Sequence, residues 1–347
     1  MRGVIEKKDM RGRKKLHLIA IFVMVLLSLG FRPKFDLRVS MSPKEPRTEN
    51  QRTHTTVTGE CSPLLLSTNP LIRPIWVPSF PGSGSELFRE LVQGTTGGVG
   101  ADYYRTKQCT ITNEQRAIVS CKTHWPVRIK APYGRVDPKR LKDSFRDRFI
   151  FLIRNPRNAI PSYMNYKWEA TTRRRDHVKQ APESIWRKKR DLYHTNQMRK
   201  WEESVSWWHM QGQYEPALYV QYEKLTDNAT GPELLRSVVN ELQQGLPDSV
   251  DLPIEDIPCI WHKIVIGGKM KRKKRTYIPG YTVEQKQQLL EMLDRMILKF
   301  SDDSNTHGAP SSATVTLLGI LHDYREDIAI NTPLDEVRFN VSSDSRT

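Results

Sequence analysis

The sequence predicts an α/β domain in which a central parallel sheet is flanked by helices. Between residues 71 and about 300, short apolar runs alternate with helical patterns, which is typical of parallel strands joined by crossover helices. Residues 149–153 are five apolar residues in a row, as expected for a strand buried on both faces. A Gly/Ser turn joins the apolar run at residues 75–77 to a helical pattern, so the domain begins with a strand–loop–helix unit.

Each strand and helix of this domain is indicated by its own pattern. The strand candidates are residues 75–77, 117–120, 149–153 and 217–220, and the helix candidates are residues 86–93, 183–211 and 283–299. Within the second helical segment, Trp201, Val205 and Trp208 recur at i, i+4 and i+7, which predicts a stripe facing the core. No internal repeat is found.

The N-terminus carries a basic tail followed by an apolar run. Residues 1–15 hold seven basic and two acidic residues, and residues 16–31 are mostly apolar. We interpret residues 1–15 as a cytosolic tail and residues 16–31 as a transmembrane signal anchor, with the remainder in the lumen as in a single-pass type II membrane protein. A cleaved signal peptide is the alternative. Both interpretations send the domain into the secretory pathway.

Two further segments flank the predicted domain of residues 71–300. Residues 32–70 are rich in Pro, Ser, Thr and charge and are predicted to form a stem or linker. Residues 301–347 are polar apart from an apolar patch at 315–321, and we describe them as a C-terminal tail of uncertain order.

The cysteines, the glycosylation motifs and the net charge agree with a secreted or luminal domain. Cys61, Cys109, Cys121 and Cys259 lack metal-binding spacing, so one or two disulfides are expected, with three full pairings open. Asn228 and Asn340 each begin an N-glycosylation motif. The net charge of +16 favours acidic partners such as phosphates, anionic glycans, nucleic acid or membrane surfaces. The secretory N-terminus makes nucleic acid the unlikely member of that set.

The loop after the first strand has the composition of a phosphate-binding loop. Small residues let backbone N–H groups approach an anion, and the helix that follows points its positive end at the same place. The loop lacks the G-K-[ST] ending of a Walker A motif, which argues against the usual ATP chemistry. An ordinary strand-to-helix turn is the alternative. The candidate anion-binding residues are Pro81, Gly82, Ser83, Gly84 and Ser85.

A second candidate anion site follows the strand at residues 149–153. This strand delivers Arg154 to its carboxyl end, where ligands of open α/β sheets bind. Pro156 then begins a turn into a helix that carries Ser162. The planar guanidinium matches a phosphate, and the serine adds a hydroxyl. The alternative is a surface arginine that happens to follow a core strand.

Together these stretches resemble the sulfotransferase family. The loop is similar to its P-K-S-G-T-T-W-like signature, and Arg154-Asn155-Pro156-Arg157-Asn158 with Ser162 is similar to its R-N-P-R-D-x-x-x-S-like signature. Residues 120–126, S-C-K-T-H-W-P, look like the K-T-H-x-P segment, and residues 222–225, Y-E-K-L, look like the Y-E-D-L segment. The resemblance covers about residues 71–300, with all four motifs in the family's order.

The resemblance implies a P-loop-like sulfotransferase fold and transfer of a sulfuryl group from the donor PAPS, without a metal, to a hydroxyl of a glycan or protein. It further implies a Golgi membrane location. The residues it assigns to donor binding are the loop residues 81–85, Arg154, Ser162 and Tyr222. His124 is implied as the catalytic base, and Lys122 as a group that stabilises charge.

Three positions depart from the family pattern. The loop lysine falls on Gly82, the second loop threonine on Glu86 and the tryptophan on Leu87. Lys122 or Arg89 would have to replace the missing cation. A non-catalytic polyanion- or nucleotide-binding relative on the same fold is therefore the alternative function. The basic runs at residues 173–175, 187–190 and 269–275 are candidate contacts for an anionic acceptor or for the donor.

Overall fold

The computed structural model describes residues 61, 72–102, 109, 117–124, 146–172, 180–210, 215–268, 277–306 and 311–335. All of them belong to one compact unit, Gly59–Thr347. The predicted cytosolic tail, the predicted anchor at residues 16–31 and nearly all of the predicted stem lie outside the described residues. Within the described part of the chain, no helix combines the length and the apolar character that a membrane span requires.

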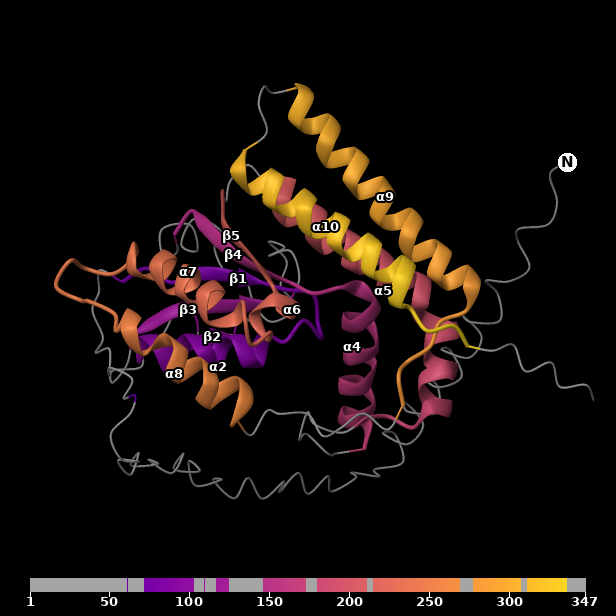
Figure 1. The fold of residues 1–347 in the computed structure, drawn as a ribbon, viewed down its shortest axis with the longest axis horizontal. Coiled ribbons are helices and arrows are strands. Elements are labelled where there is room, and N and C mark those ends of the chain that lie inside the picture. The colour runs from indigo at the N-terminus through magenta and orange to yellow at the C-terminus, as the bar shows by residue number, and fades with distance from the viewer. Residues whose placement is uncertain are drawn as a thin grey trace, which may run out of the picture. The chain divides into compact units, whose positions relative to one another are not determined.

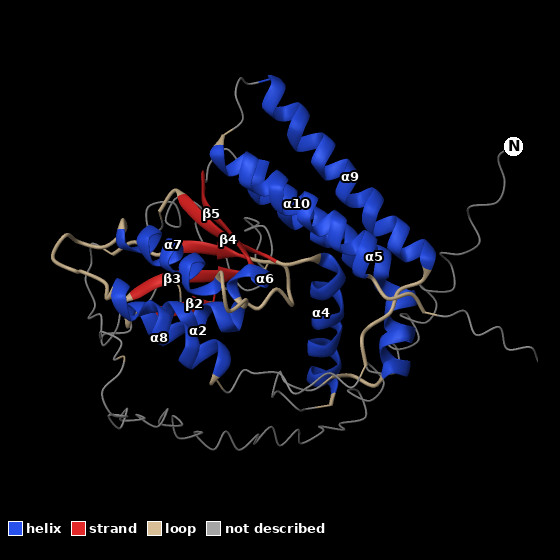
Figure 2. Ribbon diagram, viewed as in Figure 1, coloured by secondary structure: helices blue, strands red, loops and turns tan. Residues whose placement is uncertain are grey.

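A five-stranded parallel sheet forms the centre of the domain (Figures 1 and 2). Its strand order is β2-β3-β1-β4-β5, and every pair of neighbours is parallel. The α/β class predicted from the sequence is thus confirmed. The strands are β1 (Ile75–Pro78), β2 (Val99–Asp102), β3 (Ile118–Thr123), β4 (Arg148–Ile153) and β5 (Glu215–Gln221).

Four strands coincide with predicted apolar runs, whereas β2 was missed. Its sequence, V-G-A-D, has a glycine and an aspartate in four residues and lacks a β-branched run. This strand forms because it pairs with β3 at the sheet edge. Tertiary pairing rather than local propensity determines its structure.

Helices cover both faces of the sheet. The longer ones are α2 (Ser85–Thr96), α4 (Pro156–Thr171), α5 (Glu183–Met210), α7 (Gly231–Gln243), α9 (Val283–Thr306) and α10 (Ser312–Asn331). The shorter ones are α6 (Tyr222–Leu225) and α8 (Ile257–Trp261), with a 3₁₀ turn at Ile254–Asp256 and a π turn at His262–Ile266.

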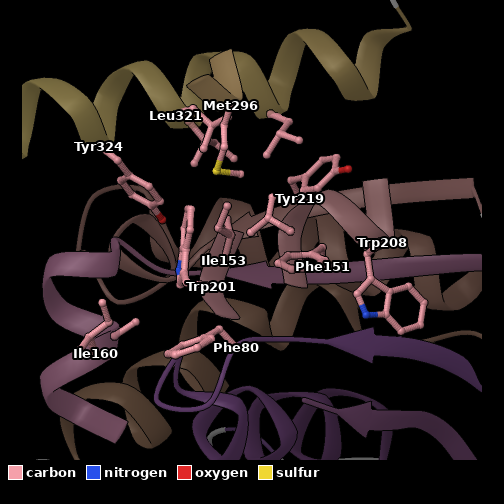
Figure 3. Packing of buried hydrophobic residues seen from close by; sticks show 14 of the residues in the cluster. Phe80, Phe151, Ile153, Ile160, Trp201, Trp208, Tyr219, Met296, Leu321 and Tyr324 are labelled. Carbon is pink, nitrogen blue, oxygen red and sulfur yellow. The ribbon is translucent and has the colours of Figure 1, made fainter. Parts of the chain in front are cut away.

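Two hydrophobic cores lie on opposite faces of the sheet because strand side chains alternate. On β4, Phe149, Phe151 and Ile153 join one core with α4, α5, α9 and α10, whereas Ile150 and Leu152 join the other with α2, α7 and α8. Figure 3 shows the first core, in which Trp201 and Trp208 of α5 pack with Phe151. The predicted stripe of Trp201, Val205 and Trp208 is buried as expected.

The C-terminal segment contributes to the first core. The helix α9 continues past the predicted domain end at residue 300, and α10 buries Leu317, Leu321, Tyr324 and Ile328. The apolar patch at residues 315–321 therefore supplies part of the inner face of a helix, through Leu317, Ile320 and Leu321, whereas Val315 is exposed. The described residues of this segment, 301–306 and 311–335, are largely helical and belong to the folded domain.

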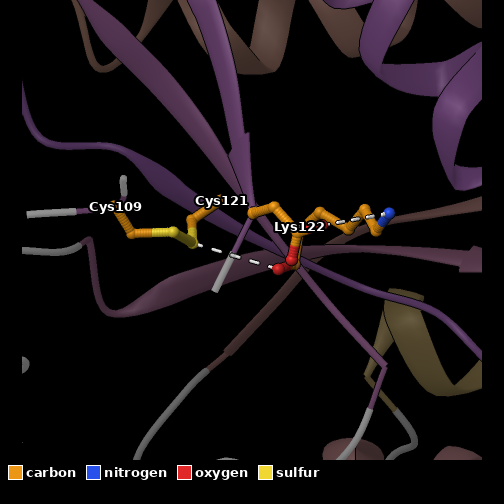
Figure 4. The surroundings of a disulfide bond; sticks show 4 residues. Cys109, Cys121 and Lys122 are labelled. Atoms are coloured by element: carbon orange, nitrogen blue, oxygen red, sulfur yellow. Dashed lines mark hydrogen bonds and ion pairs between the residues drawn. A yellow bond between two sulfur atoms is a disulfide. The ribbon is translucent and has the colours of Figure 1, made fainter. Parts of the chain in front are cut away.

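Two disulfides settle the pairing that the sequence left open. Cys61 pairs with Cys259, and Cys109 pairs with Cys121 of β3. Figure 4 shows that the side chain of Lys122 extends away from the Cys109–Cys121 bond. The second disulfide therefore anchors the strand that presents Lys122.

Candidate functional site

The loop after β1 has a backbone that only glycine adopts without strain at two positions. Gly82 and Gly84 have φ angles of 91° and 89°, in the left-handed region. A Cβ at Gly82 would lie 2.5 Å from the carbonyl oxygen of Ala159, and a Cβ at Gly84 would lie 2.1 Å from Cε2 of Tyr222. The loop therefore lies tightly between the first turns of α4 and the Tyr222 ring.

Polar groups of this loop lie at the N-terminus of α2, which begins at Ser85. Ser83 is fully buried, and within the described part of the chain its hydroxyl has no hydrogen-bond partner. Buried hydroxyls are normally hydrogen-bonded. Together with the helix N-terminus, this orphan donor makes the loop suited to bind an anion.

Arg154 lies directly against the same loop. It follows β4, is only 5% exposed, and donates a hydrogen bond from Nη1 to the carbonyl oxygen of Gly82 at 2.7 Å. Its guanidinium lies 4.2 Å above the centre of the Tyr222 ring, an arrangement that fixes the plane of the arginine fork. The two predicted anion sites thus meet in one place.

The start of α4 completes this side of the site. The side-chain oxygen of Asn155 accepts a hydrogen bond from the Arg157 amide at 3.0 Å and so caps the helix, with Pro156 in its first turn. Ser162 is buried, and its Cβ lies 3.2 Å from the position that a Cβ on Gly82 would occupy. Arg154, Ser162 and Tyr222 therefore all border the glycine loop.

Lys122 and His124 border the loop from its other side. The strands β1 and β3 are neighbours, with Val77 opposite Lys122, and the Ser79 amide donates to the Thr123 carbonyl oxygen at 2.9 Å. This pairing brings the end of β3 next to the beginning of the loop. In the sheet, β3 and β2 lie on one side of β1, and β4 and β5 lie on the other. The loop after β1 therefore lies where the strand order reverses, which is the ligand-binding position of open α/β sheets.

Lys122 is held by acidic side chains. It is buried, it forms an ion pair with Glu86 of α2, and its Nζ lies 3.5 Å from Asp102. Arg89 also pairs with Glu86, at 2.8 Å. The two cations that the sequence offered as replacements for a loop lysine therefore both bind Glu86.

Glu86 is negatively charged at neutral pH in this arrangement. Burial works to raise the pKa of its carboxyl group, but the charges of Lys122 and Arg89 outweigh burial and hold that pKa below its ordinary value. The first turn of a helix also favours a carboxylate. A fixed negative charge therefore lies beside the loop, at the residue that directly follows Ser85.

His124 is arranged to be neutral at physiological pH. Burial, followed by the charge of Lys122, lowers the pKa of its imidazole to about 4. Its Nδ1 lies 3.1 Å from the Ser79 carbonyl oxygen, a partner that can only accept a hydrogen bond. The Ser79 hydroxyl oxygen lies 3.3 Å from the same nitrogen. With the proton on Nδ1, as the carbonyl oxygen favours, the lone pair of the imidazole is on Nε2.

Residues of α10 support the Arg154 side of the site, a contribution that the sequence analysis missed. Glu223 accepts hydrogen bonds from the Asn155 amide at 3.3 Å and from the Tyr324 hydroxyl at 3.1 Å. Asp327 accepts from the Asn155 side chain at 2.7 Å and pairs with Arg157 at 2.7 Å. The apolar patch at residues 315–321 was the sequence signal that could have indicated a helix here, which continues to Tyr324 and Asp327.

A cavity of about 420 Å³ lies on the outer side of this network. Its lining includes Arg157 and Lys224 but also four carboxylates, those of Glu223, Asp227, Asp323 and Asp327. A doubly charged phosphate would be repelled there. The glycine loop and Arg154, rather than this cavity, form the candidate anion site.

The described residues contain no cluster of metal-ligating side chains. No protein-family model matches the sequence, and a search of curated proteins gives no significant match. Residues 125–126, 173–175 and 269–275, which the sequence analysis singled out, lie outside the described residues.

Proposed function

We propose that this protein is a sulfotransferase that moves a sulfuryl group from PAPS to a hydroxyl of a glycan or protein in the secretory pathway. The observation that carries the proposal is the contact of one glycine loop with Arg154 on one side and its proximity to Lys122 and His124 on the other. A nucleotide with phosphates at its 5′ and 3′ ends needs two such anion sites in one place.

Each side of the loop has a distinct role in this proposal. The backbone of residues 81–85 and the N-terminus of α2 would hold the 5′ phosphosulfate. Arg154 and Ser162 would hold the 3′-phosphate, and the Tyr222 ring keeps the arginine fork oriented. The tight fit of Gly84 against Tyr222 joins the two halves.

The reaction requires one proton acceptor and stabilisation of the leaving oxygen. The neutral His124 would take the proton of the acceptor hydroxyl on Nε2 as a new S–O bond forms to the acceptor. The S–O bond to the donor phosphate breaks, and 3′,5′-ADP leaves. Lys122 would stabilise the negative charge that develops on the 5′-phosphate oxygen of the departing 3′,5′-ADP. For this purpose Lys122 must exchange its contact with Glu86 for one with the donor.

A non-catalytic nucleotide- or polyanion-binding protein is the second candidate. Gly82 supplies no charge where the family has a lysine, and Glu86 already neutralises Lys122. In that case the Arg154 side would still bind 3′,5′-ADP, but no sulfuryl transfer would follow.

We propose further that residues 16–31 anchor the protein in the Golgi membrane with the domain in the lumen. The two disulfides support an oxidising compartment. Asn228, which begins an N-glycosylation motif, is exposed between α6 and α7 and is open to modification.

The decisive experiment combines donor binding with turnover. Purified full-length protein is titrated with 3′,5′-ADP and then incubated with labelled PAPS and a panel of polysaccharides and tyrosine peptides. Binding with transfer supports the enzyme. Binding without transfer to any acceptor favours the non-catalytic alternative, and absence of binding contradicts both.

A further inference from the structure

Aromatic and basic side chains form a continuous path that begins beside the glycine loop and reaches the surface. The ring of Tyr163 contacts Phe80 edge to face, with their centres 5.9 Å apart, and stacks on Tyr166 with an angle of 14° between the planes. The ammonium group of Lys167 lies 4.8 Å from the centre of the Tyr163 ring. The helix α4 thus carries a path from the candidate site to its exposed side.

The neighbouring helix α5 extends this surface. The helices α4 and α5 lie side by side (Figure 1). The ring of Tyr193 lies 5.4 Å from the ammonium group of Lys189 and 6.0 Å from that of Lys167. We call Tyr163, Tyr166, Lys167, Lys189 and Tyr193 the tyrosine–lysine surface. Tyr166 and Tyr193 are 50% and 40% exposed, so part of each side chain faces the solvent.

The charge of the tyrosine–lysine surface is unbalanced. Within the described part of the chain, neither Lys167 nor Lys189 forms an ion pair with a carboxylate. Burial, followed by the charges of Lys200 and Lys189, lowers the pKa of the Lys167 ammonium group. The lysines therefore repel one another, and an anionic ligand would relieve that repulsion.

The two arginines of the run at 187–190 have structural partners instead. Arg190 is buried and binds Asp335, Asp191 and the carbonyl oxygen of Gly280. Arg187 pairs with Glu183 at 2.8 Å. The two arginines are therefore held within the protein, Lys188 is exposed on α5, and only Lys189 belongs to the tyrosine–lysine surface.

We infer that the tyrosine–lysine surface binds the acceptor, and that the acceptor is an anionic glycan with carboxylate or sulfate groups on its sugars. This inference rests on the proposed function. Tyrosine rings provide flat apolar faces for sugar rings, and the lysines beside them match charged substituents along the same chain. A peptide rich in acidic residues would use the lysines but would have no sugar rings to place on the tyrosines.

The test measures glycan binding separately from donor binding. Full-length protein and the variant Lys167→Glu/Lys189→Glu are titrated with a sulfated heparin oligosaccharide at several salt concentrations. We expect the variant to lose affinity by about tenfold or more and the salt dependence of log K to fall by roughly one per lysine. Affinity for 3′,5′-ADP should stay unchanged.

Two further variants separate specific contacts from general charge. Lys188→Glu places the same charge change beside Lys189 on α5, and we expect it to change oligosaccharide affinity by less than about twofold. Tyr193→Ala should weaken oligosaccharide binding without altering its salt dependence, since no charge is removed. Thermal melting of each variant checks that the fold is retained.

Several results would overturn the inference without touching the proposed function. An equal loss in Lys188→Glu would show a diffuse charge effect. Tighter binding of an acidic tyrosine peptide than of the oligosaccharide, abolished in the double variant, would assign the surface to peptides. Failure of 3′,5′-ADP to bind, with oligosaccharide binding intact, would instead contradict the proposed function.

Discussion

The two sides of the candidate site differ in how their cations are held. On the side of β4, the Arg154 guanidinium contacts a carbonyl oxygen and a tyrosine ring, and the nearest carboxylate, Glu223, lies 3.9 Å from its Nε. On the side of β3, Lys122 forms a direct ion pair with Glu86. The guanidinium of Arg154 is therefore positioned to bind an anionic ligand, whereas the ammonium group of Lys122 is already paired with the carboxylate of Glu86.

Because of this difference, donor affinity and turnover should depend on different sides of the site. Donor affinity should depend mainly on Arg154, whose partners would remain in place when a phosphate binds. Turnover should depend on the β3 side, where His124 is neutral and Lys122 must leave Glu86 to act. Removal of the Arg154 side chain should accordingly lower donor affinity, whereas removal of the His124 side chain should lower turnover.

The largest effect is expected for His124→Ala. Loss of a general base typically lowers turnover by about 10²–10⁴-fold, and since His124 lies on the β3 side, affinity for 3′,5′-ADP should stay within about twofold. Labelled-PAPS transfer and a binding titration measure the two quantities. His262→Ala changes an exposed histidine far along the chain and serves as the control. Unchanged turnover would remove His124 from the mechanism.

The junction between the two sides is tested by Gly84→Ala. The new Cβ would meet the Tyr222 ring at 2.1 Å, and the left-handed backbone there costs a non-glycine residue about 1–2 kcal/mol. We expect both a lower melting temperature and a donor affinity reduced by about tenfold or more. Gly319→Ala, in an open position on α10, should leave both unchanged or raise stability slightly. Equal behaviour of the two variants would show that the loop tolerates a side chain.

A smaller effect of opposite sign is expected for Glu86→Gln. Removal of this charge frees Lys122 and should strengthen 3′,5′-ADP binding by roughly three- to tenfold, more at low salt. Glu90→Gln, on the same helix but without an ion pair to Lys122, is the matched control. Weaker binding in Glu86→Gln would mean that Glu86 positions Lys122 for the donor rather than competing with it.

The smallest effect is a shift in pH dependence. Because burial lowers the pKa of His124 to about 4, the base is neutral across the physiological range. The value of kcat/KM should be flat from about pH 6 to 8 and fall only as pH approaches 4. An unfolded histidine binds a proton near its ordinary pKa, so stability should decrease as pH falls from about 6.5 toward 4. A midpoint near 6.5 in kcat/KM would place the base in a solvated environment.

The sequence predicted those features that local patterns encode. The apolar run at residues 149–153 defined β4 and hence the position of Arg154 at its carboxyl end. The Gly/Ser loop defined the start of α2. Since parallel strands end at one edge of the sheet, the meeting of these two segments followed from the predicted topology.

Other features depend on distant partners and could not be predicted. The pairing of Lys122 with Glu86 joins residues of β3 and α2 that no local pattern relates. The support of Asn155 by Asp327 joins α4 to a helix at the other end of the chain. The choice between three disulfide pairings likewise required the fold.

The central claim is that one site binds both phosphate ends of a nucleotide, with Arg154 responsible for the 3′ end. Its most direct test compares 3′,5′-ADP with 5′-AMP as ligands of the unaltered protein, of Arg154→Ala and of the control Arg148→Ala on the same strand. We predict that the unaltered protein and the control prefer 3′,5′-ADP by about 100-fold, and that Arg154→Ala binds the two ligands equally. An equal loss of affinity for both ligands in Arg154→Ala, with the preference retained, would contradict the claim.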